Sequence, residues 1–214
     1  MRKTLAGLIV AAATSAAAEP IAIAALGDSL IQGYGLPIED GFVPQLETWL
    51  EAHGADVDLI NAGVSGDTTA GGAARVAWTL TPEVDGMIVA LGGNDLLRGL
   101  SPAEVRANLA TILDAAHAAD VDVLLIGFAA PLNYGPDYKA EFDAIYPDLS
   151  AAYETLFLES FFVGLPGIGT DPEAMQAFVQ PDGLHPNAAG VARIVSGVGP
   201  AVLELVAQAS REDS

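Results

Sequence analysis

Short apolar runs alternate along this chain with longer segments in which apolar residues recur every three or four positions. The runs, which are the predicted strands, cover residues 20–26, 57–60, 87–91 and 121–126, and a shorter one covers 156–158. Near-continuous apolar runs are typical of parallel strands that helices cover on both faces, because neither face then meets water. The pattern therefore predicts an α/β fold, a three-layer α/β/α sandwich around a mainly parallel sheet of about five strands.

Two of the intervening segments carry clear helix signals. Residues 42–53 have apolar side chains at helical spacing and end before Gly54, a residue that tolerates the left-handed backbone found after helices. Ser101, Pro102 and Glu104 combine an N-cap serine, a proline at the first helical position and a capping-box glutamate. We expect helices to begin at residues 42 and 102.

A further helix is predicted near the end of the chain. Asn187 is a favourable N-cap for a helix over residues 188–207. Glycine and proline both disfavour a helix interior, and proline also lacks the amide hydrogen that the helix needs. We therefore expect Gly197, Gly199 and Pro200 to kink or split this helix.

The first residues have the pattern of a secretory signal peptide. Arg2 and Lys3 precede an apolar stretch at residues 5–13, and small residues follow at 16–18. The apolar stretch is shorter than the roughly 20 residues that a membrane-spanning helix needs. We expect cleavage of residues 1–18, a periplasmic or secreted protein, and no integral membrane segment in the mature chain.

Composition and charge narrow the class of protein further. Residues 19–214 contain no internal repeat and no low-complexity linker, which predicts one domain. The full chain has a formal net charge of −20, and residues 1–18 carry two of its positive charges. Such a surface repels nucleic acid, so we expect no nucleic-acid partner. The absence of cysteine excludes disulfides and thiolate chemistry.

Polar clusters follow three of the predicted strands, and a fourth precedes the last helix. They cover residues 27–29, 61–68, 92–95 and 182–185. The carboxyl ends of parallel strands meet at one edge of a sheet, where ligands of such folds bind. Together the clusters supply a hydroxyl nucleophile, an imidazole base, a carboxylate and oxyanion donors, which are the parts that acyl transfer requires. Ser29 is the predicted nucleophile, although the G-x-S-x-G pattern of other hydrolases is absent.

The clusters resemble the four sequence blocks of the SGNH (GDSL-type) hydrolases, in the order and spacing of that family. The matching stretches are GDSL at 27–30, SGDT at 65–68, GGND at 92–95 and D-x-x-H at 182–185. APLNYGPDY at 130–138, AIYPDL at 144–149 and DGLHPN at 182–187 are similar to the periplasmic multifunctional thioesterase, arylesterase and lysophospholipase subgroup. The resemblance covers essentially the whole mature chain and implies a flavodoxin-like fold.

The resemblance also implies a role for each site residue. Ser29 would be the nucleophile, His185 the general base and acid, and Asp182 the carboxylate that orients His185. The oxyanion hole would consist of the backbone N–H groups of Ser29 and Gly66 and the side-chain amide of Asn94. These neutral, directional donors suit charge that appears only in the transition state.

The remaining histidines and one acidic residue have simpler interpretations. His53 and His117 fall near the ends of predicted helices, where a cation suits the helix dipole. No pair of histidines has the spacing of a metal site, so we expect no metal and no cofactor. Asp28 is expected to hold the turn beside Ser29, and we assign no chemistry to it.

The leading hypothesis is an exported, monomeric, metal-independent serine hydrolase of small acyl esters, thioesters or lysolipids. Leu96, Leu97 and residues 130–132 are expected either to line an acyl groove or to anchor their loops on the core. A carbohydrate O-acetylesterase is one alternative, since the same family blocks serve that chemistry. A binding module with the same fold is another, but it would require a broken set of site residues.

Overall fold

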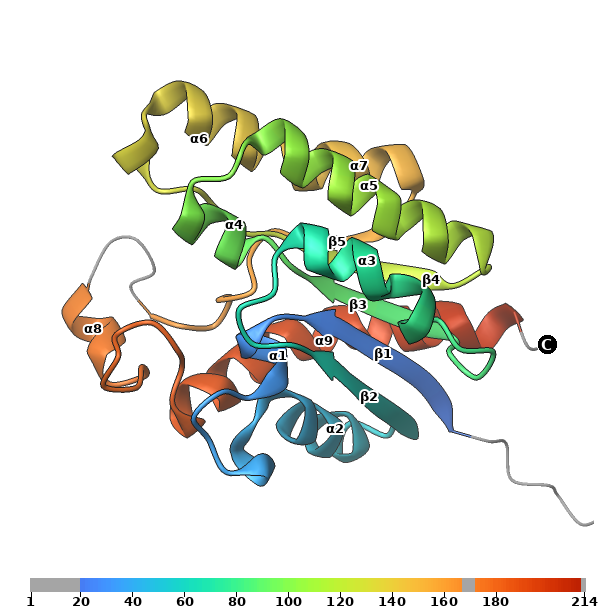
Figure 1. Ribbon diagram of the computed structural model, residues 1–214. Coiled ribbons are helices and arrows are strands. Elements are labelled where there is room, and N and C mark those ends of the chain that lie inside the picture. Colours follow the sequence, from blue (N-terminus) through green and yellow to red (C-terminus); the bar gives the residue numbers. More distant parts are fainter. Residues whose placement is uncertain (1–19, 167–171, 213–214) are drawn as a thin grey trace, which may run out of the picture.

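A five-stranded parallel sheet forms the centre of the computed structural model, which describes residues 20–166 and 172–212 (Figure 1). The strand order is β2-β1-β3-β4-β5, and every neighbouring pair is parallel. The strands are β1 (Ile21–Gly27), β2 (Val57–Gly63), β3 (Gly86–Ala90), β4 (Asp122–Ile126) and β5 (Leu156–Leu158). This is the strand order of flavodoxin-like folds, so the predicted sheet is confirmed. The predicted signal peptide, residues 1–18, lies outside the described residues.

Helices cover both faces of the sheet, which completes the predicted three layers (Figure 1). One face carries α2 (Phe42–Ala52) and α9 (Ala188–Glu212), and the other carries α3 (Thr69–Thr79), α5 (Pro102–Ala118) and α7 (Ile145–Tyr153). The shorter elements are α1 (Ser29–Gln32), α4 (Gly93–Arg98), α6 (Pro136–Asp143), α8 (Pro172–Gln176) and two 3₁₀ turns, Ile38–Asp40 and Leu132–Tyr134.

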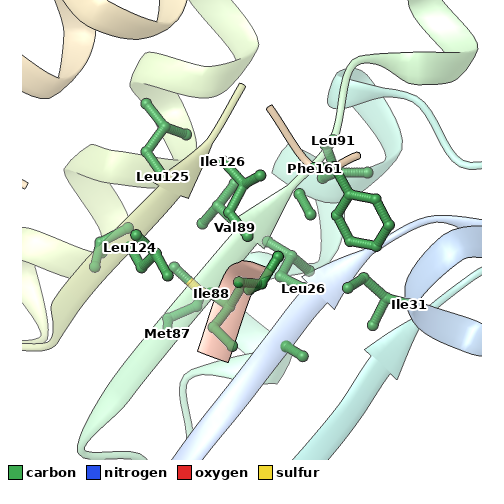
Figure 2. Packing of buried hydrophobic residues seen from close by; sticks show 14 of the residues in the cluster. Leu26, Ile31, Met87, Ile88, Val89, Leu91, Leu124, Leu125, Ile126 and Phe161 are labelled. Atoms are coloured by element: carbon green, nitrogen blue, oxygen red, sulfur yellow. The ribbon is translucent and has the colours of Figure 1, made fainter. Parts of the chain in front are cut away.

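Apolar side chains from the central strands fill the space between the layers. Leu26 of β1, Val89 of β3 and Leu125 of β4 are neighbours in the strand register and share one face of the sheet, and all three side chains are fully buried (Figure 2). The edge strand β2 instead alternates buried and exposed residues, because only one of its faces is covered. It continues to Gly63 rather than ending at residue 60 as predicted. The apolar runs are thus explained by burial on both faces.

The last helix was predicted to be kinked or split, and the structure shows that it is not split. α9 runs without interruption from Ala188 to Glu212, with Pro200 inside it. Its two central glycines allow close packing: a Cβ at Gly199 would lie 2.5 Å from the Trp49 ring, and one at Gly197 would lie 2.7 Å from a backbone oxygen. Tertiary packing therefore outweighs the low helix propensity of these residues.

Residues 188–211 are also long and apolar enough to cross a membrane by length and composition alone. Among the described residues this is the one helix with that property. Its apolar face packs on the sheet, where Ile194, Val198, Val202 and Leu205 are fully buried. The apolar composition of α9 is thus accounted for by its place in the core.

The predicted helix caps are confirmed in part. Asn187 Oδ1 accepts a hydrogen bond from the Gly190 N–H at 3.0 Å and so caps α9 as expected. Ser101 occupies the N-cap position of α5, but its side chain makes no capping hydrogen bond. The predicted capping box was therefore wrong, although Glu104 still lies in the first turn, where a negative charge suits the helix dipole.

Candidate active site

Ser29 is the first residue of α1, directly beyond the carboxyl end of β1. Asp28 caps this short helix, because its Oδ1 accepts a hydrogen bond from the Leu30 N–H at 3.0 Å. Glycine is required at position 27, since a Cβ there would overlap the Ile31 side chain. The strand thus ends in Gly-Asp-Ser so that the chain can turn sharply and leave the serine hydroxyl at the rim of the sheet.

The structure brings Ser29, His185 and Asp182 together although 156 residues separate the first two. His185 Nε2 lies 2.9 Å from Ser29 Oγ, and His185 Nδ1 lies 2.7 Å from Asp182 Oδ2. The other carboxylate oxygen of Asp182 accepts hydrogen bonds from the backbone N–H groups of Leu184 and His185, at 2.9 and 3.0 Å. Each carboxylate oxygen therefore helps to fix the histidine.

Protonation at this cluster follows from these bonds. The hydrogen bond to His185, together with those from the Leu184 and His185 N–H groups, lowers the pKa of Asp182 to about 2. An ionised Asp182 can only accept, so Nδ1 of His185 carries the proton of that bond. In the neutral ring, the Nε2 lone pair then faces the Ser29 hydroxyl, which is the arrangement that a general base needs.

Gly66 and Asn94 line the same pocket as Ser29. Gly66 has a φ of +78°, and its carbonyl accepts a hydrogen bond from Arg98 Nη2 at 2.7 Å. The Gly66 N–H donates no hydrogen bond to any group in the described part of the chain. The Asn94 side chain donates one amide hydrogen to Asp28 Oδ2 at 3.0 Å. These contacts hold two potential oxyanion donors beside the serine.

Asp28 has a contact that the sequence did not reveal. It is 2% exposed, and burial raises its pKa to about 6 against the opposing effects of the Leu30 and Asn94 hydrogen bonds and of His185. The prediction that it holds the turn is confirmed by its bond to Leu30. Its second oxygen also anchors the amide of Asn94, which no local sequence signal indicates.

A pocket of about 520 Å³ opens beside the serine, and most of its lining is apolar. Leu96, Leu97 and Pro131 line it as predicted, whereas Ala130 is buried in the core and Leu132 is exposed outside it. Further apolar lining residues were not predicted: Leu30, Tyr34, Phe128, Tyr134, Phe162 and Leu184. The carboxyl and imidazole groups in the lining belong to Asp28 and His185. Such a pocket suits an acyl chain beside a reactive centre.

Metal ligands do not gather in the described ranges 20–166 and 172–212. No group of three or more His, Asp or Glu side chains there has the geometry of a metal site. His53 instead stacks on Trp49, with ring centroids 3.7 Å apart, and its Nδ1 lies 2.7 Å from the Trp49 carbonyl oxygen. Its position at the end of α2 agrees with the structural role predicted for it.

Comparison with known proteins places this site in a family. The family model of GDSL-like lipases and acylhydrolases matches residues 25–193, a range that includes Ser29, Gly66, Asn94, Asp182 and His185. The chain belongs to the GDSL-like lipase/acylhydrolase family. Its resemblance to SGNH (GDSL-type) hydrolases and its class as an ester hydrolase are thereby confirmed.

Relatives of this GDSL-family chain align over most of their length. Esterase TesA of Pseudomonas aeruginosa is 37% identical over 85% of this chain and 87% of its own. Thioesterase 1/protease 1/lysophospholipase L1 of Escherichia coli strain K12 is 34% identical over 84% of this chain and 81% of its own. The crystal structure of AlinE4, an SGNH-hydrolase family esterase, superimposes with a TM-score of 0.72 at 42% identity and covers 88% of this chain and 98% of that one.

Proposed function

We propose that this GDSL-family enzyme cleaves acyl esters and thioesters through an acyl-enzyme intermediate on Ser29. The observation that carries the proposal is the pair of hydrogen bonds from Ser29 Oγ to His185 Nε2, 2.9 Å, and from His185 Nδ1 to Asp182 Oδ2, 2.7 Å. This pair lies at the edge of a largely apolar pocket. A hydroxyl, an imidazole and a carboxylate in this order form a complete system for nucleophilic catalysis.

In the first half-reaction, Ser29 Oγ attacks the acyl carbonyl carbon as His185 Nε2 takes the hydroxyl proton. The carbonyl electrons move onto its oxygen, and Asp182 stabilises the imidazolium that forms. The Ser29 N–H, the Gly66 N–H and the free amide hydrogen of Asn94 are the donors for this oxyanion. Each such donor typically lowers the barrier by about 3 kcal/mol.

Collapse of the tetrahedral intermediate then breaks the bond to the leaving group. His185 gives its proton to the departing alkoxide or thiolate, and the acyl group remains esterified to Ser29. His185 next takes a proton from a water molecule that attacks the acyl carbon, and it returns this proton to Ser29 Oγ as the carboxylic acid leaves. The cycle consumes one water and needs no redox partner or cofactor.

The pocket favours acyl chains longer than acetyl as substrates. Its volume of about 520 Å³ far exceeds what an acetyl group fills, and Phe128, Phe162 and Leu96 supply apolar walls. Fatty acyl esters, thioesters and lysolipids therefore fit this pocket better than acetylated sugars, because burial of each added methylene contributes about 0.8 kcal/mol. The relatives named as an esterase and as a thioesterase/lysophospholipase agree with this substrate class.

The test is hydrolysis of p-nitrophenyl acetate, butyrate, octanoate and palmitate, with Ser29→Ala as the control and EDTA present throughout. We expect serine-dependent turnover with kcat/KM higher for octanoate than for acetate. Turnover confined to acetate would favour the carbohydrate O-acetylesterase. Full activity of Ser29→Ala would contradict the mechanism, and failure of a fluorophosphonate to label the wild type would favour a binding module.

We also infer that the enzyme is exported and that residues 19–214 form its mature domain. The inference is supported by the basic, apolar and small-residue segments of residues 2–18. Expression of the full chain in a bacterial host, followed by mass measurement of the periplasmic protein, tests it. A mature N-terminus at Glu19 is expected, and a cytoplasmic protein that retains residues 1–18 would contradict it.

A further inference from the structure

The hydrogen bond between Ser29 and His185 joins a short helix and a loop that no strand pairing holds together. His185 lies outside every helix and strand, in residues 177–187 between α8 and α9. Ser29 starts α1, whose end is closed by hydrogen bonds from the Gly33 and Tyr34 N–H groups to the Ser29 carbonyl, both at 3.1 Å. The distance between hydroxyl and imidazole therefore depends on how these two segments are fixed to each other.

One side-chain amide spans the two segments. Gln180 Nε2 donates to the Tyr34 carbonyl at 2.8 Å and to the Pro186 carbonyl at 3.0 Å. The backbone N–H of Gln180 also donates to the His185 carbonyl at 2.7 Å. Both hydrogens of the amide are thus used, one on Tyr34, which follows the helix of Ser29, and one on Pro186, the residue after His185.

The surroundings are shaped to this side chain. Gly35 has a φ of +77°, and a Cβ there would overlap Gln180 Oε1, so a larger residue would displace the amide. The ring of Tyr34 lies against the ring of His185, with centroids 4.7 Å apart. Gln180 does not itself line the pocket. Its influence on the imidazole is therefore exerted through Tyr34 and Pro186.

We propose that Gln180 is a positioning residue for the reaction proposed above, on which this inference rests. Its amide clamps the Tyr34 and Pro186 carbonyls and so keeps His185 Nε2 within hydrogen-bond reach of Ser29 Oγ. Reaction rates respond steeply to such alignment: a misplacement of about 1 Å costs on the order of a hundredfold. Loss of the clamp should therefore lower the rate of serine attack while substrate binding in the pocket stays nearly unchanged.

The chain offers a matched control for this side chain. Gln45 of α2 also donates from its Nε2 to two backbone carbonyls, Asp40 at 2.8 Å and Ala188 at 3.2 Å. That amide joins α2 to the start of α9 and does not line the pocket. Gln45 and Gln180 thus each donate two hydrogen bonds from one side-chain amide to two backbone carbonyls. Of the two, Gln180 is the one that bridges the segments of Ser29 and His185.

The experiment compares Gln180→Glu with Gln45→Glu, since an ionised carboxylate has the same shape but cannot donate. For Gln180→Glu, we expect kcat on p-nitrophenyl butyrate and the rate of fluorophosphonate labelling both to fall by about tenfold or more, with KM within about twofold. Gln45→Glu should lower the thermal midpoint by about as much as Gln180→Glu does, because each loses two hydrogen bonds. Its kcat and labelling rate should stay within about twofold of the wild-type values. Gln180→Met, which removes both donors without adding charge, serves if the glutamate variant does not fold.

The outcomes separate the clamp from the proposed function. Equal kcat in the Gln180 and Gln45 variants, with serine-dependent turnover in the wild type, would overturn the clamp alone. A rise in KM at unchanged kcat would also overturn it, because that result indicates a role in substrate binding. If the wild type turns over no faster than Ser29→Ala, the proposed function is overturned, and the role of Gln180 is overturned with it.

Discussion

Single side chains in this site perform more than one task, and Asp28 is the clearest case. One of its carboxylate oxygens caps α1, and the other anchors the Asn94 amide, so the same residue orients the helix of the proposed nucleophile and a proposed oxyanion donor. Because one amide hydrogen of Asn94 is donated to Asp28, the direction of the second amide hydrogen is fixed before substrate binds. Donors that are preorganised in this way need no reorganisation during the reaction.

Removal of this donor should affect the transition state rather than substrate binding. We expect Asn94→Ala to lower kcat by about a hundredfold to a thousandfold with little change in KM, because the oxyanion forms only in the transition state. Steady-state kinetics on p-nitrophenyl butyrate measure both constants. Asn133→Ala is the control, since Asn133 lines the pocket without a predicted role. A raised KM at unchanged kcat for Asn94→Ala would argue against the oxyanion role.

Burial of Asp28 should appear in the pH dependence of stability. Its pKa rises from 3.8 to about 6 on folding, so the folded state holds its proton more tightly than the unfolded state. The carboxyl therefore destabilises the fold as pH rises from about 4 to 6, by about 3 kcal/mol once both states are ionised. No such penalty exists below about pH 3, where both states are protonated.

The variant Asp28→Asn tests this sign. The asparagine does not ionise. The thermal midpoint of the variant minus that of the wild type should therefore increase as pH rises from about 4 to 7. Midpoints measured at each pH give the difference, with the exposed Asp58→Asn on β2 as the control. A difference between Asp28→Asn and wild type that stays constant over this range would show that burial of the carboxyl carries no such cost.

Among the elements, the contact between β2 and α1 positions the site most directly. Gly63 ends β2 against the backbone of α1, and a Cβ there would overlap the Gln32 backbone nitrogen. This strand end leads into the loop of Gly66, whereas α1 carries Ser29. The absence of a side chain at position 63 thus sets how closely two parts of the site approach.

Gly63→Ala should therefore disturb both stability and activity. Overpacking of this kind costs about 1 to 3 kcal/mol, and the forced shift of α1 should lower kcat. Gly54→Ala is the comparison, because Gly54 has a positive φ but no atom within 4 Å of the methyl group that alanine would add, so its cost is backbone strain alone. Urea unfolding and kcat of both variants distinguish them. Unchanged kcat in Gly63→Ala would mean that α1 accommodates the methyl group without moving Ser29.

At the scale of the whole molecule, charge repulsion is the dominant electrostatic feature. The chain has 28 acidic and 8 basic residues, and ion pairs such as Arg75–Asp67, Arg106–Asp148 and Lys139–Asp143 use few of the acidic ones. The remaining carboxylates repel each other more strongly in the compact state than in the unfolded chain. Screening by salt should weaken this repulsion, since the Debye length falls from about 30 Å at 0.01 M to about 3 Å at 1 M.

We expect the thermal midpoint to rise when NaCl is increased from about 0.01 M to 1 M, over which range the Debye length contracts most. Thermal unfolding followed by circular dichroism measures the shift. An equal rise in KCl would attribute it to screening rather than to binding of sodium. A midpoint that stays constant or falls with both salts would mean that the favourable ion pairs outweigh the net repulsion.

Local patterns were sufficient to predict the sheet and the polar residues that meet beyond its carboxyl edge. The central strands β1, β3 and β4 appear as apolar runs because they are buried on both faces. Ser29, Gly66, Asn94 and His185 lie in short polar blocks directly beyond strands or before a helix, so the rule that ligands bind at the carboxyl edge groups them in advance. These features depend on neighbours in the chain, which a sequence records.

Contacts between distant segments could not be predicted in this way. The continuity of α9 depends on the fit of Gly199 against Trp49. In α3, Gly72 packs on Leu91, but a glycine inside a helix weakens the local sequence signal for that helix. Phe128 and Phe162 line the pocket from separate loops, while Gln180 and Asp28 act through residues far along the chain. Such contacts exist only once the backbone has brought their partners together, because packing and burial outweigh the small local preferences of each residue.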